Sequence, residues 1–183
     1  MIKAFLFISS FIISIISHGC SCKEPVSIES LRNQEFNSSD HVFIATVISV
    51  SGDYLSSEVI IEEVFKGNFK KTTELIIYNP LWCEPVIHKC EDKWLIYASE
   101  YENKLYLNAC GLSRSVNEPE ENRHFRLIPP PPPPPPLPSD STQTEYIPKP
   151  IPQEIIEQNK VKTKKLLVEE IRLLRLRSNG VEK

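Results

Sequence analysis

The sequence lacks the short motifs that mark several large enzyme classes. Nowhere in its 183 residues is there a glycine-rich phosphate loop, a Gly-x-Ser-x-Gly nucleophile elbow or a His-Glu-x-x-His zinc helix. The histidines beyond the leader, His41, His88 and His124, are scattered along the chain. We therefore expect a protein that is not an enzyme and that has no cofactor and no metal of its own.

Basic charge is scarce where a nucleic-acid surface would need it. Between Cys20 and Ile128 acidic residues outnumber lysines and arginines, and no basic cluster is interleaved with aromatic residues. The nearest basic group, Lys66 with Lys70 and Lys71, follows a strand pattern and is typical of a solvated turn. Nucleic acid is therefore not an expected partner.

A hydrophobic run long enough to span a membrane is also missing. The most apolar stretch, residues 4–16, is shorter than the about 20 residues that a spanning helix needs. Lys3 precedes this stretch, and small residues lie three and one positions before Cys20, the spacing that signal peptidases accept. We interpret residues 1–19 as a signal peptide that is removed on export, in preference to a retained membrane anchor.

Cysteine is present in a small and odd number. The five are Cys20, Cys22, Cys83, Cys90 and Cys110. Outside the cytoplasm thiols tend to oxidise, so these residues predict a disulfide framework first and a metal site second. Because five is odd, one cysteine must have another fate. Cleavage of the leader would make Cys20 the first residue of the mature protein, with its amine, carbonyl and thiol all available for reaction.

Proline divides the chain by composition. An unbroken block at 129–136 with further prolines up to residue 152 predicts a proline-rich linker at 129–152. Eight prolines in the polyproline II conformation would make a stiff spacer of roughly 25 Å, although such a run could also dock into an aromatic groove. We therefore place one domain at 20–128.

A helical pattern comes after the linker at residues 153–178, before a short tail at 179–183. Its imperfect apolar stripe consists of Ile155, Ile156, Val161, Leu166, Leu167, Ile171 and Leu174. Lysines and arginines occupy other positions, and Gly180 comes next as a stop signal. This pattern predicts an amphipathic helix that packs on the domain, pairs with another helix or lies on an anionic surface.

Short strand patterns dominate the domain. They cover residues 41–50, 58–65, 74–78, 94–99 and 104–108. Residues 100–103 form a polar connection of hairpin length, and a short helix is expected at 28–34. The pattern favours a mainly β fold, a small five-stranded barrel of the OB type with a short helix; a two-sheet sandwich is the alternative.

The order of the cysteines and strands resembles a known family. The pieces are Cys20-Ser21-Cys22 at the leader junction, Ser39 to Val47, Val64 to Gly67, Cys83, Trp94 to Ala98 and Cys110. This ordered set, over about residues 20–115, resembles the N-terminal netrin-like domain of the tissue inhibitors of metalloproteinases, in a bacterial-type single-domain form. The resemblance implies an OB-fold barrel and an exported inhibitor of zinc metalloendopeptidases.

In that family the free amine and carbonyl of the first cysteine bind the catalytic zinc of the target protease. The resemblance implies that Cys20 is this chelator and that Ser21 enters the specificity pocket. The rest of the inhibitory ridge would be Cys22, Pro80, Leu81 and Trp82. An open position on a catalytic zinc can accept such a ligand.

The resemblance also implies two disulfides, Cys20–Cys83 and Cys22–Cys110. They would hold the ridge rigid, so that less freedom is lost when the target binds. Cys90 would then be left as a free thiol.

Lipidation of Cys20 is the alternative, because the leader junction partly resembles a lipoprotein processing site. The four remaining cysteines could then pair as Cys22–Cys110 and Cys83–Cys90. Acylation of the amine would abolish zinc chelation, and the protein would be a lipid-anchored surface binding module without inhibitory activity. The expected partner is thus a zinc metalloprotease or another extracytoplasmic protein, with membrane contact only if Cys20 is lipidated. Either form would be secreted or held at the cell-envelope surface.

Overall fold

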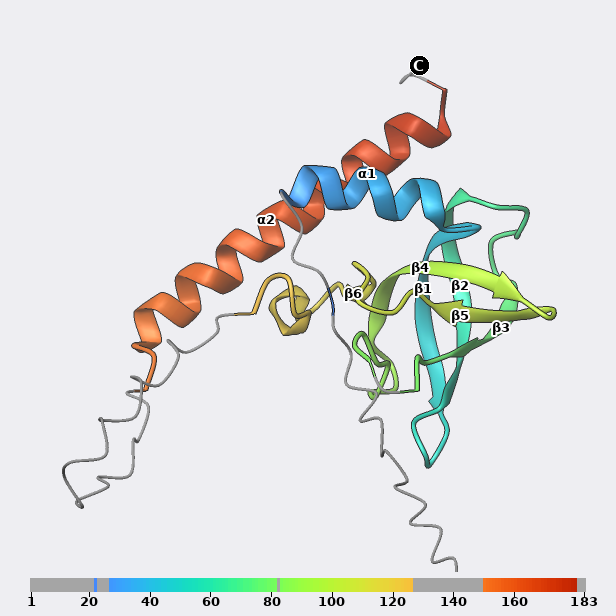
Figure 1. The fold of residues 1–183 in the computed structure, drawn as a ribbon, viewed down its shortest axis with the longest axis horizontal. Coiled ribbons are helices and arrows are strands. Elements are labelled where there is room, and N and C mark those ends of the chain that lie inside the picture. The colour runs from blue at the N-terminus through green and yellow to red at the C-terminus, as the bar shows by residue number, and fades with distance from the viewer. Residues whose placement is uncertain (1–21, 23–26, 82, 127–149, 181–183) are drawn as a thin grey trace, which may run out of the picture.

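A computed structural model describes residues 22, 27–81, 83–126 and 150–180 (Figure 1). The leader expected at 1–19 and most of the expected linker lie outside the described residues. The elements in chain order are α1 (Ile28–Ser38), β1 (His41–Val50), β2 (Ser56–Lys66), β3 (Glu74–Tyr78), β4 (Lys93–Tyr101), β5 (Lys104–Leu107), β6 (Arg114–Ser115), the 3₁₀ helix η1 (Pro119–Glu121) and α2 (Gln153–Ser178). Neither described α-helix combines the length and the apolar character needed to cross a membrane.

Five strands close into a barrel. The sheet order is β1-β2-β3-β5-β4, and β4 pairs back with β1. All of these pairings are antiparallel except β3 with β5, which is parallel. The short strand β6 pairs antiparallel with Trp94 and Leu95 at the start of β4, ahead of the part that pairs with β5. The expected five-stranded OB-type barrel with a short helix and a C-terminal helix is confirmed, and the chain does not form the two-sheet sandwich.

The element boundaries match the sequence pattern closely. Strands β1 and β3 and helix α2 have the bounds that the pattern predicts. Helix α1 begins at Ile28 as expected but continues to Ser38, four residues past the expected end. Its N-cap is Ser27, whose side chain accepts a hydrogen bond from the Ser30 amide. The pattern does not predict strand β6, because two residues are too short to show an alternation.

Two hydrophobic cores lie on opposite faces of the barrel wall. On β1, Phe43 and Val47 point into the barrel, while Val42 and Ile44 point outward beneath the helices. Successive side chains on a strand face opposite sides, so a strand that is covered on both faces reads as an unbroken apolar run. This is why the sequence around β1 is so rich in branched apolar residues.

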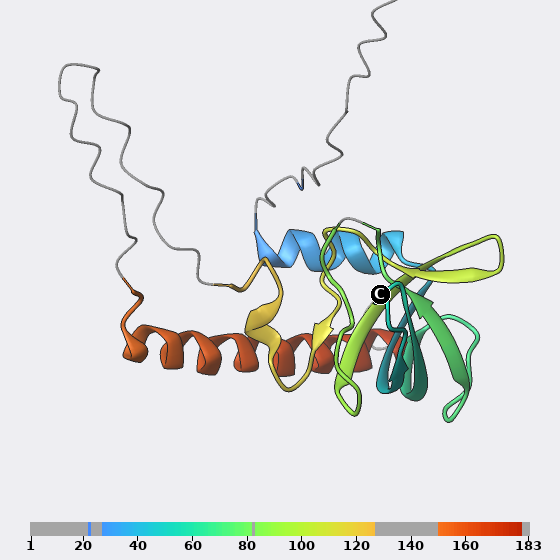
Figure 2. The same ribbon diagram turned by 90° about the horizontal axis from the view of Figure 1, so that it is seen from below.

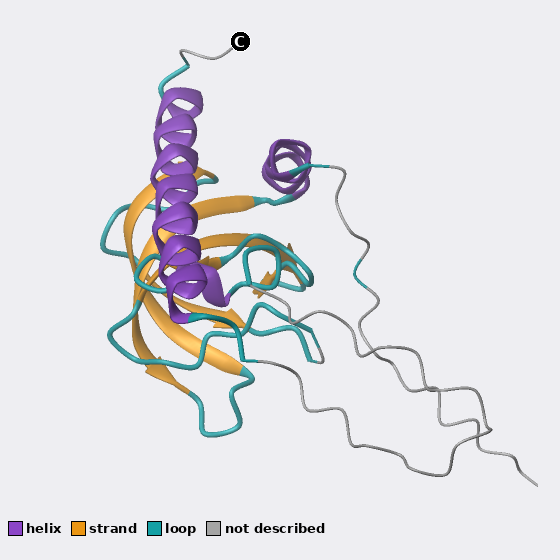
Figure 3. Cartoon of the chain, turned by 90° about the vertical axis from the view of Figure 1, so that its left-hand side faces the viewer, coloured by secondary structure: helices purple, strands orange, loops and turns teal. Residues whose placement is uncertain are grey.

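Helix α2 packs against the barrel and supplies the second core. It crosses the outer surface of the strands (Figure 3), and Leu167 and Leu174 are buried there. At its C-terminal half, Arg175 makes two 2.8 Å hydrogen bonds to the carboxylate of Glu63 on β2. Of the three roles open to this helix, packing on the domain is the one observed. The expected linker therefore connects two parts of one folded body.

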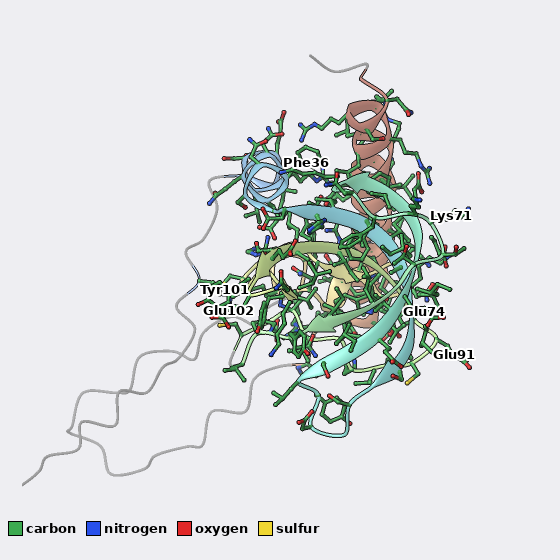
Figure 4. All side chains as sticks on the ribbon, turned by 90° about the vertical axis from the view of Figure 1, so that its right-hand side faces the viewer. Phe36, Lys71, Glu74, Glu91, Tyr101 and Glu102 are labelled. Atoms are coloured by element: carbon green, nitrogen blue, oxygen red, sulfur yellow. A yellow bond between two sulfur atoms is a disulfide. The ribbon has the colours of Figure 1, made fainter. Side chains whose placement is uncertain are left out.

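Helix α1 lies on the same side of the barrel as α2 (Figures 1 and 2). Phe36, labelled in Figure 4, is on the side of α1 that faces α2, with the guanidinium carbon of Arg177 5.2 Å from its ring centroid. The ammonium nitrogen of Lys66, at the end of β2, lies 5.2 Å from the same centroid. The two helices thus form one cover over the outer core.

A buried charge cluster joins these elements. The carboxylate of Glu170 on α2 is 2% exposed and accepts hydrogen bonds from Arg114 Nη2 at 2.8 Å and Arg32 Nε at 2.7 Å. Tyr97 Oη on β4 donates a third, at 2.7 Å. Burial by itself would raise the pKa of Glu170, but the charges and hydrogen bonds of Arg114 and Arg32 hold that pKa below its ordinary value. Burial also raises the pKa of Tyr97.

Candidate functional site

The N-terminal segment is attached to the barrel by a disulfide. Cys22 is bonded to Cys110, 88 residues later, and their Cα atoms are 5.6 Å apart. The structure therefore contains this bond of the expected framework. It holds the chain that leads from the expected mature N-terminus against the loop after β5. Cys20 and Ser21 themselves lie outside the described residues.

The loop that carries Cys110 is fixed on both sides. The Cys110 amide donates a 2.8 Å hydrogen bond to the carbonyl of Glu84, and its carbonyl is 2.8 Å from Nε2 of His124. The next residue, Gly111, must be small, since a Cβ atom there would lie 2.2 Å from Oε1 of Glu35 and 2.8 Å from the carbonyl oxygen of Asn108. The disulfide therefore lies on a loop that hydrogen bonds hold in place and that packs closely against α1.

A buried asparagine shapes the connection between β3 and β4. The Asn79 side chain donates to the carbonyls of Tyr54 and Ile87 and accepts a 3.0 Å hydrogen bond from the Ile87 amide. These bonds hold both ends of the segment that contains Pro80 and Leu81. Leu81 is 67% exposed, and Pro80 is half-buried. Trp82, the third ridge residue expected here, lies outside the described residues.

The cysteines of this connection behave differently from each other. Cys83 is disulfide-bonded, whereas Cys90 is a free and exposed thiol. Cys90 is therefore not paired with Cys83 in this structure. The expected partner of Cys83 in the inhibitor-like framework, Cys20, lies outside the described residues.

We define the disulfide edge as Cys22, Leu81, Cys83, Glu84 and Cys110. These residues come from three separate parts of the chain and are joined by the Cys22–Cys110 bond and the hydrogen bond from Cys110 to Glu84. Arg126 approaches from a fourth segment, with Nη2 3.2 Å from Oε1 of Glu84. Chemically, the edge combines the disulfide-bonded Cys22 with the exposed apolar side chain of Leu81.

The described residues hold no group of three or more His, Cys, Asp and Glu side chains placed to bind a metal ion. A disulfide bond is compatible with an extracytoplasmic location.

Several residues that build this edge carry no signal in the sequence. Asn79, Glu84 and His124 act through hydrogen bonds to main-chain atoms that are distant along the chain, and nothing in their local pattern marks them. Only the dipeptide Cys110-Gly111 hints at a tight loop, because glycine after a cysteine permits a close approach of another segment.

Neither a family model nor a curated protein matches this chain.

Proposed function

We propose that this protein is an exported inhibitor of zinc-dependent endopeptidases that acts through the mature N-terminus at Cys20. The α-amine and carbonyl of Cys20 would chelate the target's catalytic zinc as a five-membered ring, in place of the metal-bound water. Ser21 would enter the specificity pocket, and the exposed Leu81 with its neighbours Pro80 and Trp82 would contact the rim. The protein would carry no metal of its own.

The state of the cysteines is the observation that carries this proposal. Cys22 is bonded to Cys110, Cys83 is disulfide-bonded and Cys90 is free. An inhibitor-like framework requires this distribution, whereas a lipidated Cys20 would leave Cys83 and Cys90 to pair with each other. The distribution therefore favours the inhibitor over the lipid-anchored binding module.

The rigidity of the disulfide edge supports the same function. The Cys110 amide donates a hydrogen bond to the Glu84 carbonyl, and hydrogen bonds of the Asn79 side chain hold the segment before Leu81. A preorganised contact surface loses little conformational freedom on binding, and this is how small inhibitors reach high affinity. The lipid-anchored module would use the linker to present a free helix. Because α2 packs on the barrel, it is not presented in this way.

The test compares two forms of the secreted protein with the same disulfides. One begins at Cys20, and the other has a single alanine added before Cys20. The first should inhibit at least one member of a panel of zinc endopeptidases, and the second should not, because an amide nitrogen at Cys20 is no longer a donor. A serine endopeptidase serves as the control target. If the form with a free Cys20 leaves the whole panel fully active, the proposal fails.

Mass spectrometry of the mature protein from its native host distinguishes the inhibitor from the lipid-anchored alternative. A free Cys20 amine with a disulfide to Cys83 supports inhibition. A diacyl or triacyl mass on Cys20 excludes zinc chelation and makes the protein a lipid-anchored binding module at the cell-envelope surface.

A further inference from the structure

A cavity of about 430 Å³ lies beside the disulfide edge, between the middle of the β3–β4 connection and the segment that contains β6 and η1. This volume lies within the range of small-molecule sites, about 300–1,000 Å³. Pro85, Val86 and Trp94 supply its apolar lining, and Arg114 lies against it. Nothing in the inhibitory proposal uses this space.

An arginine–carboxylate ion pair and a histidine–carboxylate contact bridge the walls of the cavity. Arg126 Nη2 is 3.2 Å from Glu84 Oε1, and His88 Nε2 is 4.0 Å from Glu121 Oε2. All four side chains are substantially exposed, so water screens both pairs and each contributes little to stability. Arg126 balances the charge of Glu84, and both contacts can separate at low cost to admit a ligand.

Arg114, one of the lining residues, carries a donor without a partner. Its side chain is 1% exposed. Nη1 donates to the Leu112 carbonyl at 2.8 Å, Nη2 donates to Glu170, and buried Nε has no partner among the described residues. Buried donors without a partner are rare and costly, so such a group calls for an acceptor.

The other buried polar groups of the lining are already committed. Asn122 Nδ2 donates to the carbonyls of Gly111 and Ser113, and Trp94 Nε1 donates to Asp92. The Ser115 hydroxyl is likewise bonded to Asp92. The recognition of a ligand's polar group would therefore fall to Arg114 and, at the mouth, to Arg126.

Arg114 belongs to a cluster in which guanidinium groups outnumber carboxylates. Two guanidinium groups, those of Arg114 and Arg32, share the single carboxylate of Glu170. The other buried acids nearby are Glu35, whose pKa is raised by burial, and Asp92, whose carboxylate is already bonded to Trp94 and Ser115.

We propose that this cavity binds a small carboxylate on an apolar body. The apolar body would lie against Pro85, Val86 and Trp94, and the carboxylate would face Arg114, where a hydrogen bond from a charged donor is strong. Such a carboxylate can belong to a free organic acid or to the C-terminus of a peptide. The two sources share this chemistry and differ only in whether a peptide chain is attached to the apolar body.

The first experiment titrates the folded, disulfide-bonded protein with 3-phenylpropanoate and with 3-phenylpropanamide, monitored by heteronuclear NMR. Acetyl-Gly-Phe and its C-terminal amide provide the peptide arm. The carboxylates should bind roughly tenfold more tightly than the matched amides, because only the charged group makes a charge-assisted bond with arginine. Stronger binding of the first acid identifies a free acid as the ligand type, and stronger binding of the peptide identifies a C-terminus.

The second experiment fills the cavity. Val86→Phe adds bulk to its wall and should abolish the binding of both acids, while Ile76→Phe, at an exposed position of β3, should leave it unchanged. Thermal melts check that both variants fold. Arg114→Lys keeps the charge but removes Nε, and where it folds it should erase the preference for acid over amide.

Two results would overturn the proposal. One is the absence of any shift with either acid at millimolar concentration. The other is binding that Val86→Phe leaves intact. Because Val86 is not part of the disulfide edge, inhibition of zinc endopeptidases should survive Val86→Phe, so the failure of one proposal can be told from the failure of the other.

Discussion

Arg114 and Glu170 form a buried, two-point ion pair that joins the short strand β6 to helix α2. Arg114 Nη2 lies 2.8 Å from Oε2 of Glu170, and Nη1 lies 3.3 Å from Oε1, with both side chains almost fully excluded from solvent. A buried pair of this kind is costly to break, because the remaining partner keeps its charge without compensation.

Loss of this pair should therefore destabilise the whole fold. We expect Glu170→Ala to lower the free energy of unfolding by about 3–5 kcal/mol, measured by chemical denaturation. The neighbouring Glu169 is exposed and pairs with Arg172, one turn of the same helix away. Glu169→Ala should change stability by no more than about 0.5 kcal/mol. Equal effects of the two substitutions would show that α2 is not held by the buried cluster.

The carboxylate of Glu170 also predicts that the stability of the protein depends on pH. The pKa of Glu170 is lowered in the folded protein from its ordinary 4.5, so its contribution is present above that value and is lost as the pH falls through the lower folded pKa. The stability gap between the parent and Glu170→Gln should thus be constant at neutral pH and shrink below about pH 4.5. Glu35, whose pKa is raised mainly by burial and also by the charge of Glu170, is present in both proteins. A gap that widens on acidification would contradict the assignment.

Lys66 should stabilise the end of α1. Its ammonium group donates to the carbonyls of Phe36 at 2.8 Å and Asn37 at 3.2 Å, in a helix that has no basic residue in its last turn. A positive charge there satisfies free carbonyls and complements the helix dipole. We expect Lys66→Met to cost about 1–2 kcal/mol of stability, measured by chemical denaturation. Lys70→Met, at an exposed position of the next turn, is the control and should have no measurable effect.

The space around Gly111 makes a sharp prediction about the loop that carries Cys110. In Gly111→Ala the new methyl group would clash with a main-chain oxygen and the Glu35 carboxylate. We therefore expect the free energy of unfolding, measured by thermal denaturation, to fall by about 1–3 kcal/mol. Gly52 has no atom within 4 Å of an added Cβ. Gly52→Ala should therefore be neutral or slightly stabilising in the same thermal denaturation assay. If Gly111→Ala melts with the parent, the loop is less tightly wedged than the structure indicates.

The barrel could be predicted because its strands have local signals. The run at β1 is apolar on both faces, and the polar residues 100–103 mark the turn between β4 and β5. Helix α2 could be predicted to the residue, and packing on the domain was one of its expected roles, but the strands that it covers could not be predicted. Glu170 lies on the apolar stripe between Leu167 and Leu174, and this misfit is the one local sign of a buried charge partner.

The candidate site is less accessible to sequence reasoning. The Cys22–Cys110 bond was expected from a family resemblance, whereas Asn79 and Glu84 act through bonds to residues that no local pattern connects to them. Arg114 gives no signal, because its partner lies 56 residues further along the chain. Long-range polar contacts of this kind depend on the finished fold and not on periodicity.

The Cys22–Cys110 bond should support both stability and inhibition. Replacing both cysteines by serine removes a link across 88 residues, and we expect a loss of about 2–5 kcal/mol in the free energy of unfolding. The loss of inhibition should exceed the loss of folded protein, because the N-terminal segment is then held at the edge by one link fewer and less rigidly. Cys90→Ser is the matched control, since this thiol is free and exposed, and it should keep the stability and the inhibition constant of the parent. If the folded double variant still inhibits as the parent does, the disulfide edge is not part of the inhibitory surface.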